Sequence, residues 1–315
     1  MQEFIIATRG SKLALWQSNH IKDILKRQNP NIDISLKVII TTGDKIVDKP
    51  LSAIGGKGLF LKELEEAMLR GEAHLAVHSL KDVPTILPDG FTLGAITKRE
   101  DCRDALLSFK YPNISSLPQG AVIGTSSLRR KMQISAMRSD LIIKDLRGNV
   151  DTRIKKLQNG EYDAIILASA GINRLGFKDS VKYLYNIPLD EIVPSMGQGA
   201  LGIEAVNDAK VLEIIAKLAD EDSMIETTIE RDFVDRLEGG CQVPIGVNAS
   251  FLDSDTLQVR AALGLPDGSE ILHDKKVIKK QDFKTIGTAL ADEFIDRGAK
   301  ELLRRAEIMA SDMSL

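Results

Sequence analysis

The sequence predicts an α/β protein with two lobes of parallel or mixed sheet and a C-terminal α+β domain. Three observations support this prediction. Short apolar strands alternate with amphipathic helices from the N-terminus, and the same pattern starts again near residue 121. Beyond residue 245, alternating strands precede one long helix. A chain of 315 residues is also too long for one ordinary core, so two or three domains are expected.

The composition excludes several classes of protein. The formal net charge is −3, which argues against nucleic-acid binding because phosphate backbones select a basic surface. Cys102 and Cys241 are the only cysteines, so no disulfide framework is indicated. The N-terminus does not read as a signal peptide, and no apolar run is long enough to span a bilayer. A reducing cytosol is therefore the expected location, with no membrane partner.

The first lobe begins with a strand, a turn and a helix. Ser11 ends the turn and is suited to cap the helix. Trp16 follows the apolar spacing of that helix and is expected in the core. The glycines of residues 55–58 indicate a loop, and Gly71 closes the next helix. The expected elements are strands at residues 4–7, 34–41 and 75–78, and helices at residues 12–27 and 59–70.

The second lobe repeats this order, so two similar halves are expected to face each other across a cleft. Its strands are expected at residues 121–124, 141–145 and 164–168, each followed by a turn and the start of a helix. An apolar run to Val206 and a helical region over residues 209–237 then lead to the loop that carries Cys241. The C-terminal domain is expected to hold strands at residues 247–252, 257–263 and 270–278, and a helix that extends through residue 305.

Basic and hydroxyl side chains gather in the loops and helix starts of both lobes. In parallel or mixed sheets, ligands bind beyond the carboxyl ends of strands, so these side chains are expected at one site. Arginine forks bind carboxylates in pairs of hydrogen bonds, and helix N-termini add backbone donors. The pattern therefore predicts a site for an anion with several carboxylates or phosphates, although each arginine alone is more simply a solvated residue. The set comprises Arg9, Ser11, Lys57, Lys81, Thr125, Ser126, Ser127, Arg129, Arg130, Arg147, Arg153 and Arg174.

Asp82 and Cys241 are the candidates for chemistry. Asp82 could hold a substrate N–H or move a proton, but aspartate is equally common as a turn residue before a proline such as Pro84. Cys241 follows two glycines and could be a nucleophile, a covalent anchor or a small buried apolar side chain. His74 and His78 have no second cluster of ligands nearby, so no metal site is expected.

With these residues assembled, the chain closely resembles the porphobilinogen deaminase (hydroxymethylbilane synthase) family. The matching stretches run in family order nearly end to end, and together they are highly specific. The C-terminal domain matches more loosely. The stretches are Thr8-Arg9-Gly10-Ser11, Gly55-Gly56-Lys57-Gly58-Leu59-Phe60, His78-Ser79-Leu80-Lys81-Asp82-Val83-Pro84, Gly124-Thr125-Ser126-Ser127-Leu128-Arg129-Arg130, Arg147-Gly148-Asn149-Val150 and Gly239-Gly240-Cys241.

The resemblance implies two lobes like those of periplasmic binding proteins and a third domain. Domain 1 would cover residues 1–98 and 198–218, domain 2 residues 99–197, and domain 3 residues 219–315. It also implies a cytoplasmic, monomeric transferase of porphyrin, tetrapyrrole and heme biosynthesis. In the family, the cysteine matching Cys241 holds a dipyrromethane cofactor through a thioether. Four porphobilinogen molecules are added to it with loss of ammonia, and hydrolysis frees hydroxymethylbilane.

The resemblance also implies a role for each site residue. Asp82 would be the catalytic acid, and Lys57 would cover the site from a mobile loop. The other cofactor-binding residues would be Ser79, Lys81, Thr125, Ser127, Arg129 and Arg130. Substrate would be held by Arg9, Ser11, Gln17, Lys57, Phe60, Arg147, Arg153, Arg174 and Gln198.

Two alternatives remain on the residues alone. The paired lobes and basic turns also suit a non-catalytic binding protein for a small anion, but that reading leaves Cys241 and Asp82 without a role. A phosphate-handling α/β enzyme is the other alternative. It is weakened because the chain has no Walker-type phosphate loop.

Overall fold

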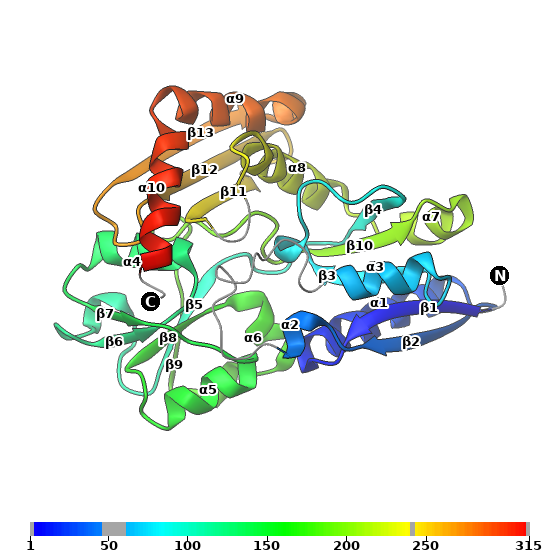
Figure 1. The fold of residues 1–315 in the computed structure, drawn as a ribbon, viewed down its shortest axis with the longest axis horizontal. Helices are drawn as coiled ribbons and strands as arrows, with labels where there is room; N and C mark the ends of the chain where they lie inside the picture. The colour runs from blue at the N-terminus through cyan, green and yellow to red at the C-terminus, as the bar shows by residue number, and fades with distance from the viewer. Residues whose placement is uncertain (1–2, 46–60, 240–242, 313–315) are drawn as a thin grey trace.

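The computed structural model describes residues 3–45, 61–239 and 243–312, and these residues form three sheets (Figure 1). Two sheets have five strands each and mix parallel with antiparallel pairing. The third sheet has three antiparallel strands. Two lobes of mixed sheet and a C-terminal α+β domain are therefore confirmed.

The first lobe is built on a sheet of order β2-β1-β3-β10-β4. Strands β1 and β3 are parallel, whereas β10 runs antiparallel to both of its neighbours. One of its hydrophobic clusters is built around Phe4, Ile6 and Leu75, and others lie around Leu64 and Leu80. The strands are β1 Glu3–Arg9, β2 Asp33–Ile39, β3 Leu75–Ser79, β4 Phe91–Ile96 and β10 Leu201–Val206, and the helices are α1 Lys12–Gln28, α2 Thr42–Lys45, α3 Lys62–Leu69 and α7 Ala209–Ala216.

The second lobe has the same topology, with sheet order β7-β6-β8-β5-β9. Here β5 is the antiparallel strand, in the place that β10 takes in the first lobe. The strands are β5 Asp104–Ser108, β6 Val122–Gly124, β7 Ile142–Lys144, β8 Ala164–Ala168 and β9 Tyr183–Asn186, and the helices are α4 Leu128–Met137, α5 Val150–Gln158 and α6 Ser169–Leu175. Short 3-10 helices lie at Leu80–Asp82, Ile114–Ser116, Lys178–Ser180 and Lys280–Asp282.

The third domain packs helices on an antiparallel sheet and contacts both lobes. Its strands are β11 Ile245–Phe251, β12 Thr256–Gly264 and β13 Ile271–Lys279, and its helices are α8 Glu221–Arg236, α9 Phe283–Asp296 and α10 Ala299–Asp312. Phe233 of α8 and Phe294 of α9 meet edge to face at 5.3 Å in its core. In Figure 1, α10 descends towards α4 of the second lobe. On the other side, Arg231 of α8 donates to the carbonyls of Val83 and Pro84 in the first lobe.

Several expectations need correction. Trp16 is 36% exposed and stacks on His20, so its expected place in the core is wrong. The expected final helix is two helices, because Gly298 adopts a φ of +90° that other residues avoid. The strands β4, β5 and β9 were not expected at all.

Two crossover segments join the lobes, one before β5 and one before β10. They are hydrogen-bonded to each other, since Thr97 N–H donates to the Leu201 carbonyl at 3.0 Å and Glu100 N–H to the Gly199 carbonyl at 3.1 Å. After the second crossover, β10 returns to the first sheet. The domain boundaries given above stay a prediction.

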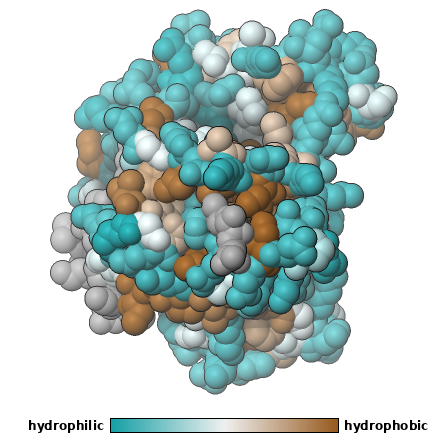
Figure 2. Space-filling model, turned by 90° about the vertical axis from the view of Figure 1, so that its right-hand side faces the viewer, coloured by the Kyte–Doolittle hydropathy of each residue, from teal (hydrophilic) through white to brown (hydrophobic). Residues whose placement is uncertain are grey.

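One face of the molecule, at the right-hand side of Figure 1, is mainly polar. Figure 2 shows that face as mostly hydrophilic, with hydrophobic residues gathered near its middle. Among residues 3–45, 61–239 and 243–312, no helix has the length and apolar character needed to cross a membrane. Within the same ranges, no group of His, Cys, Asp and Glu side chains could hold a metal ion.

Candidate active site

A cleft of about 520 Å³ lies between the two lobes and is lined from both. That volume falls within the usual range for small-molecule sites, about 300–1,000 Å³. The predicted residues that line it are Arg9, Ser11, Ser79, Lys81, Asp82, Arg130, Arg147, Arg153, Arg174 and Gln198.

The local folding of the chain explains why these residues meet. Arg9 ends β1 and Ser79 ends β3, which are parallel neighbours, so both lie at one edge of the sheet. Ser11 caps α1 by accepting a hydrogen bond from the Ala14 N–H at 3.3 Å, as predicted. The Leu80 N–H donates to the Ala200 carbonyl at 3.0 Å. This bond ties the 3-10 turn that carries Lys81 and Asp82 to the second crossover.

Lys81 and Asp82 form the charged pair of the first lobe. Asp82 is exposed and Lys81 is half-buried beside it. Burial lowers the pKa of Lys81 to about 8, against the opposing effect of the Asp82 charge. Lys81 also donates to Gln198 Oε1 at 3.4 Å. A lowered pKa means that the ammonium of Lys81 is less stable here than in water, and a nearby negative charge stabilises it.

The second lobe contributes half-buried arginines that bind carbonyls rather than carboxylates. Arg153 Nε donates to the Gly148 carbonyl at 2.7 Å, and Arg174 Nη2 to the Gly199 carbonyl at 2.6 Å. The pKa of each is lowered to about 10, mainly by burial, and for Arg153 also by the charges of Arg130 and Arg147. Ligand carboxylates would relieve this crowding of positive charge, so the cleft is suited to a polyanion.

Arg130 is held by a buried acid. Asp104 Oδ1 accepts from Arg130 Nη2 at 2.7 Å and Nε at 3.1 Å, and Oδ2 accepts from Arg129 Nη1 at 2.7 Å. Burial alone would raise the pKa of Asp104, but the two arginine charges outweigh it and hold that pKa well below its ordinary value. Arg130 still lines the cleft, whereas Arg129 does not.

Comparison with known proteins decides the family. A family model described as "Porphobilinogen deaminase, dipyromethane cofactor binding domain" matches residues 4–213, and one described as "Porphobilinogen deaminase, C-terminal domain" matches residues 224–296. The chain belongs to the porphobilinogen deaminase family. The porphobilinogen deaminase of Sulfurimonas denitrificans is 70% identical over 309 residues, which cover 98% of this chain and 99% of that protein. The porphobilinogen deaminase of Campylobacter jejuni is 59% identical over 307 residues, with 98% and 99% covered.

A solved structure from another family also matches, though only distantly. The periplasmic aliphatic sulphonate binding protein SsuA from Escherichia coli is 14% identical, with a TM-score of 0.38. The match covers 76% of this chain and 71% of that one.

Four residues predicted for this deaminase site lie behind the cleft wall. Arg129 donates to the Val193 carbonyl at 2.8 Å and to Ser195 Oγ at 3.1 Å, so its guanidinium braces the second crossover. Ser127 caps α4, and Thr125 Oγ1 accepts from the Ser127 N–H at 3.2 Å. Gln17 Nε2 donates to Ser79 Oγ at 2.8 Å and orients that hydroxyl. Cys241, Lys57 and Phe60 lie outside the described residues.

Sequence reasoning missed three residues of this deaminase cleft and its support. Lys12 and Asp151 pair at 3.0 Å and line the cleft from α1 and α5, one in each lobe. Each is a single charge at a helix start, a pattern that gives no sign of a partner in the other lobe. Asp104 lies in a run of charged residues that reads as surface, yet it is fully buried.

Proposed function

We propose that the chain is a transferase that condenses four porphobilinogen molecules head to tail onto a dipyrromethane attached to Cys241 through a thioether. Each addition breaks the bond between the aminomethyl carbon and nitrogen of the substrate and releases ammonia. A carbon–carbon bond forms to the terminal pyrrole, whose ring carbon loses a proton, and final hydrolysis frees hydroxymethylbilane. The observation that carries the proposal is the cleft in which cations of both lobes surround Asp82.

The charges of the cleft fit a chain of pyrroles. Each porphobilinogen unit brings an acetate and a propionate, so the elongating chain accumulates negative charge. Arg153 and Arg174 carry positive charge that their carbonyl partners do not neutralise. Arg147 and Arg9 add two more cations to the lining. A polycarboxylate is therefore a better match than a small monovalent anion.

Asp82 is the residue we assign to proton transfer. Loss of ammonia leaves an electron-poor carbon on the substrate, and a nearby carboxylate stabilises the positive charge that develops. Asp82 raises the pKa of both Lys81 and Arg153, which places its charge within electrostatic reach of both cations. An exposed carboxylate in this position can also accept a pyrrole N–H and remove the proton after the bond forms.

The bound dipyrromethane would supply the pyrrole carbon to which the first substrate is joined. The described residues fit such a group, because cations of both lobes line a cleft large enough for more than one carboxylate. Lys81, Arg130 and Ser79 would hold its side chains. Thr125, Ser127 and Arg129 would support that binding from behind the wall. Residues 1–98 with 198–218, 99–197 and 219–315 are the domains we propose, in a cytoplasmic monomer.

Intact mass and turnover test the proposal together. Purified protein should carry a covalent excess that matches a dipyrromethane, and Cys241→Ser should lose it. The Asp82→Asn variant should fold and keep the excess, while its porphyrin-forming activity falls by about 10²–10⁴-fold. Asp89→Asn, which changes an exposed acid in the same lobe, serves as the matched control and should be fully active. Protein without any mass excess, or near-normal turnover by Asp82→Asn, would refute the assignment and favour an anion-binding protein.

A further inference from the structure

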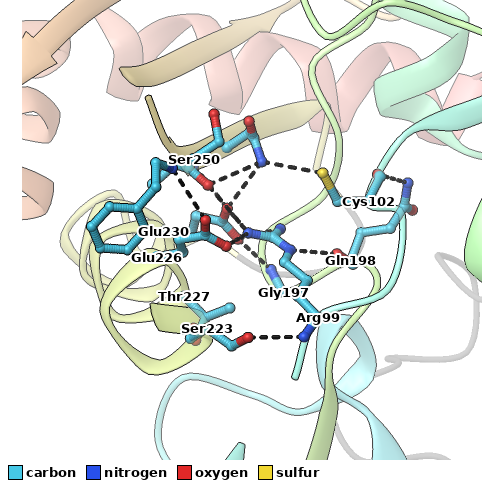
Figure 3. Close-up of polar contacts among 12 residues, drawn as sticks. Arg99, Cys102, Gly197, Gln198, Ser223, Glu226, Thr227, Glu230 and Ser250 are labelled. Carbon is cyan, nitrogen blue, oxygen red and sulfur yellow. Dashed lines mark hydrogen bonds and ion pairs between the residues drawn. The ribbon is translucent and has the colours of Figure 1, made fainter. Parts of the chain in front are cut away.

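A buried polar chain connects the two lobes behind the cleft. Gln198 lies in the second crossover and is fully buried. Its Nε2 donates to the Cys102 carbonyl at 2.8 Å and to Asp104 Oδ1 at 3.0 Å. Figure 3 shows Gln198 beside Cys102 and Arg99, next to the contacts with the third domain. The Cys102 carbonyl and Asp104 Oδ1 are both acceptors, so the Gln198 amide must turn its nitrogen towards them. Its oxygen then faces Lys81 and accepts a hydrogen bond from Nζ at 3.4 Å.

Asp104 accepts four hydrogen bonds from side chains of the protein, three on Oδ1 and one on Oδ2. Its two oxygens accept from Arg129 Nη1, from Arg130 Nε and Nη2, and from Gln198 Nε2. Asp104 is also fully buried and is not among the residues that line the cleft. Asp104 therefore has no direct part in binding. It fixes the groups around it.

Arg130 is oriented by this arrangement. Its Nε and Nη2 each donate one hydrogen bond to Asp104. Its Nη1 donates one to the Ile166 carbonyl at 3.0 Å. A guanidinium has five N–H groups, so the other two can donate to a ligand in the cleft that Arg130 lines. These bonds hold the guanidinium of Arg130 in one orientation towards the cleft. Bidentate binding of a carboxylate requires such a fixed orientation.

We propose that Asp104 and Gln198 are positioning residues that hold Arg130 of the second lobe and Lys81 of the first in a fixed relation beside Asp82. The inference rests on the proposed function of the cleft. Asp104 acts on Arg130 directly and on Lys81 through the amide of Gln198. Gln198 lies in the second crossover, and Asp104 is the first residue of β5, directly after the first crossover. The spacing between one cation of each lobe is therefore set at the point where the lobes join.

The charges around Lys81 make this relation measurable. The groups that act on its charge are Asp82, Arg130, Asp104 and Arg129, in addition to burial. Both carboxylates favour the charged ammonium and both arginines disfavour it. Neutralising Asp104 leaves the arginines less compensated, which favours the uncharged amine. A carboxylate at position 198 would have the opposite effect on Lys81.

The test titrates Lys81 directly, by NMR of protein labelled at the lysine ε-carbon and assigned with Lys81→Arg. The Asp104→Asn variant should lower the Lys81 pKa by about one unit, and Gln198→Glu should raise it by a similar amount. The alkaline limb of the pH–rate profile should move in the same directions. Asp101→Asn is the matched control. Asp101 lies in the first crossover and pairs with Arg103, so this substitution should leave the Lys81 titration unchanged.

Opposite shifts in the two variants support the proposal, because a purely structural defect would not move one pKa in two directions. If Asp104→Asn does not fold, Gln198→Glu alone decides, since it keeps Asp104 and both arginines. An unchanged Lys81 titration in every folded variant overturns the proposal. The NMR measurement needs no turnover, so failure of the positioning role and failure of the proposed reaction are distinguished.

Discussion

Glu230 is the buried acid on which the contact between α8 and the crossovers depends, and Glu230→Gln should strongly destabilise the protein. The carboxylate is fully buried and accepts from Arg99 Nη1 at 2.7 Å and Nη2 at 3.0 Å (Figure 3). It also accepts from the N–H groups of Gly197 at 2.6 Å and Ala249 at 2.8 Å. Through these bonds one side chain of the third domain holds both crossovers and β11.

The expected loss follows from what the amide cannot do. Glutamine replaces one accepting oxygen by an NH₂ group, which faces at least two donors whichever way the amide turns. Removing one partner of a buried ion pair costs about 3–5 kcal/mol, because the other charge stays buried without compensation. Burial opposes the charge of Arg99, and Glu230 with its neighbours outweighs it and raises the Arg99 pKa. We therefore expect a loss of about 3–5 kcal/mol of unfolding free energy.

Guanidinium unfolding followed with two probes is the assay. Trp16 is the only tryptophan, so fluorescence reports the first lobe, while far-UV circular dichroism reports the whole chain. Glu226→Gln is the matched control, since Glu226 contacts Arg99 at a longer 3.3 Å and its side chain is 15% exposed. Its loss should be about 1 kcal/mol. If Glu230→Gln lowered the unfolding free energy no more than Glu226→Gln, the contact between α8 and the crossovers would not depend on Glu230.

Two further predictions concern pH and the crossover backbone. Burial and the neighbouring Glu204 raise the pKa of Glu65 to about 7, above its ordinary 4.5. The protonated Glu65 therefore contributes its full stability below pH 4.5, and this contribution is lost as pH rises to about 7. Glu65→Gln should remove that loss and flatten the thermal unfolding midpoint between pH 5 and 8; an unchanged profile would contradict it. Gly199 has a φ of +96°, and a Cβ there would lie 2.4 Å from the Glu100 carbonyl oxygen, so Gly199→Ala should cost more than the strain of about 1–3 kcal/mol alone. Gly120→Ala, with a φ of +76° and open space around it, should show only the strain, and equal losses in the two variants would refute the steric argument.

Local signals in the sequence were enough to predict the start of α1 and the turns that follow β1 and β3. Ser11 caps α1 because its hydroxyl reaches the third N–H along the chain, a contact that depends on neighbours in sequence. Arg9 and Lys81 were placed correctly for a related reason. Neighbouring parallel strands have their carboxyl ends at the same edge of the sheet, so residues that follow those ends lie close together.

Contacts between distant segments were the part that local patterns could not supply. Trp16 follows an apolar spacing, yet its neighbour is Arg174 of the other lobe, 5.9 Å from the ring, and the position of α6 is not encoded near residue 16. Strand β5 begins with a charged residue, so it lacks the apolar start that marks a strand. Asp104 can be buried there only because two arginines from α4 meet it, and their side chains were expected to face the ligand.

The arrangement of Asp104 also explains how a chain of net charge −3 can present a basic cleft. Asp104 lies behind the site and is fully buried against two arginines, and among the described residues Asp82 and Asp151 are the only acids in the lining. Positive charge is therefore concentrated towards the ligand, while most carboxylates face solvent elsewhere. In a cleft bounded by low-dielectric walls such a distribution attracts anions more strongly than the net charge suggests. The net charge of the chain argues against nucleic acid as a partner, but it says nothing about the binding of a small polycarboxylate.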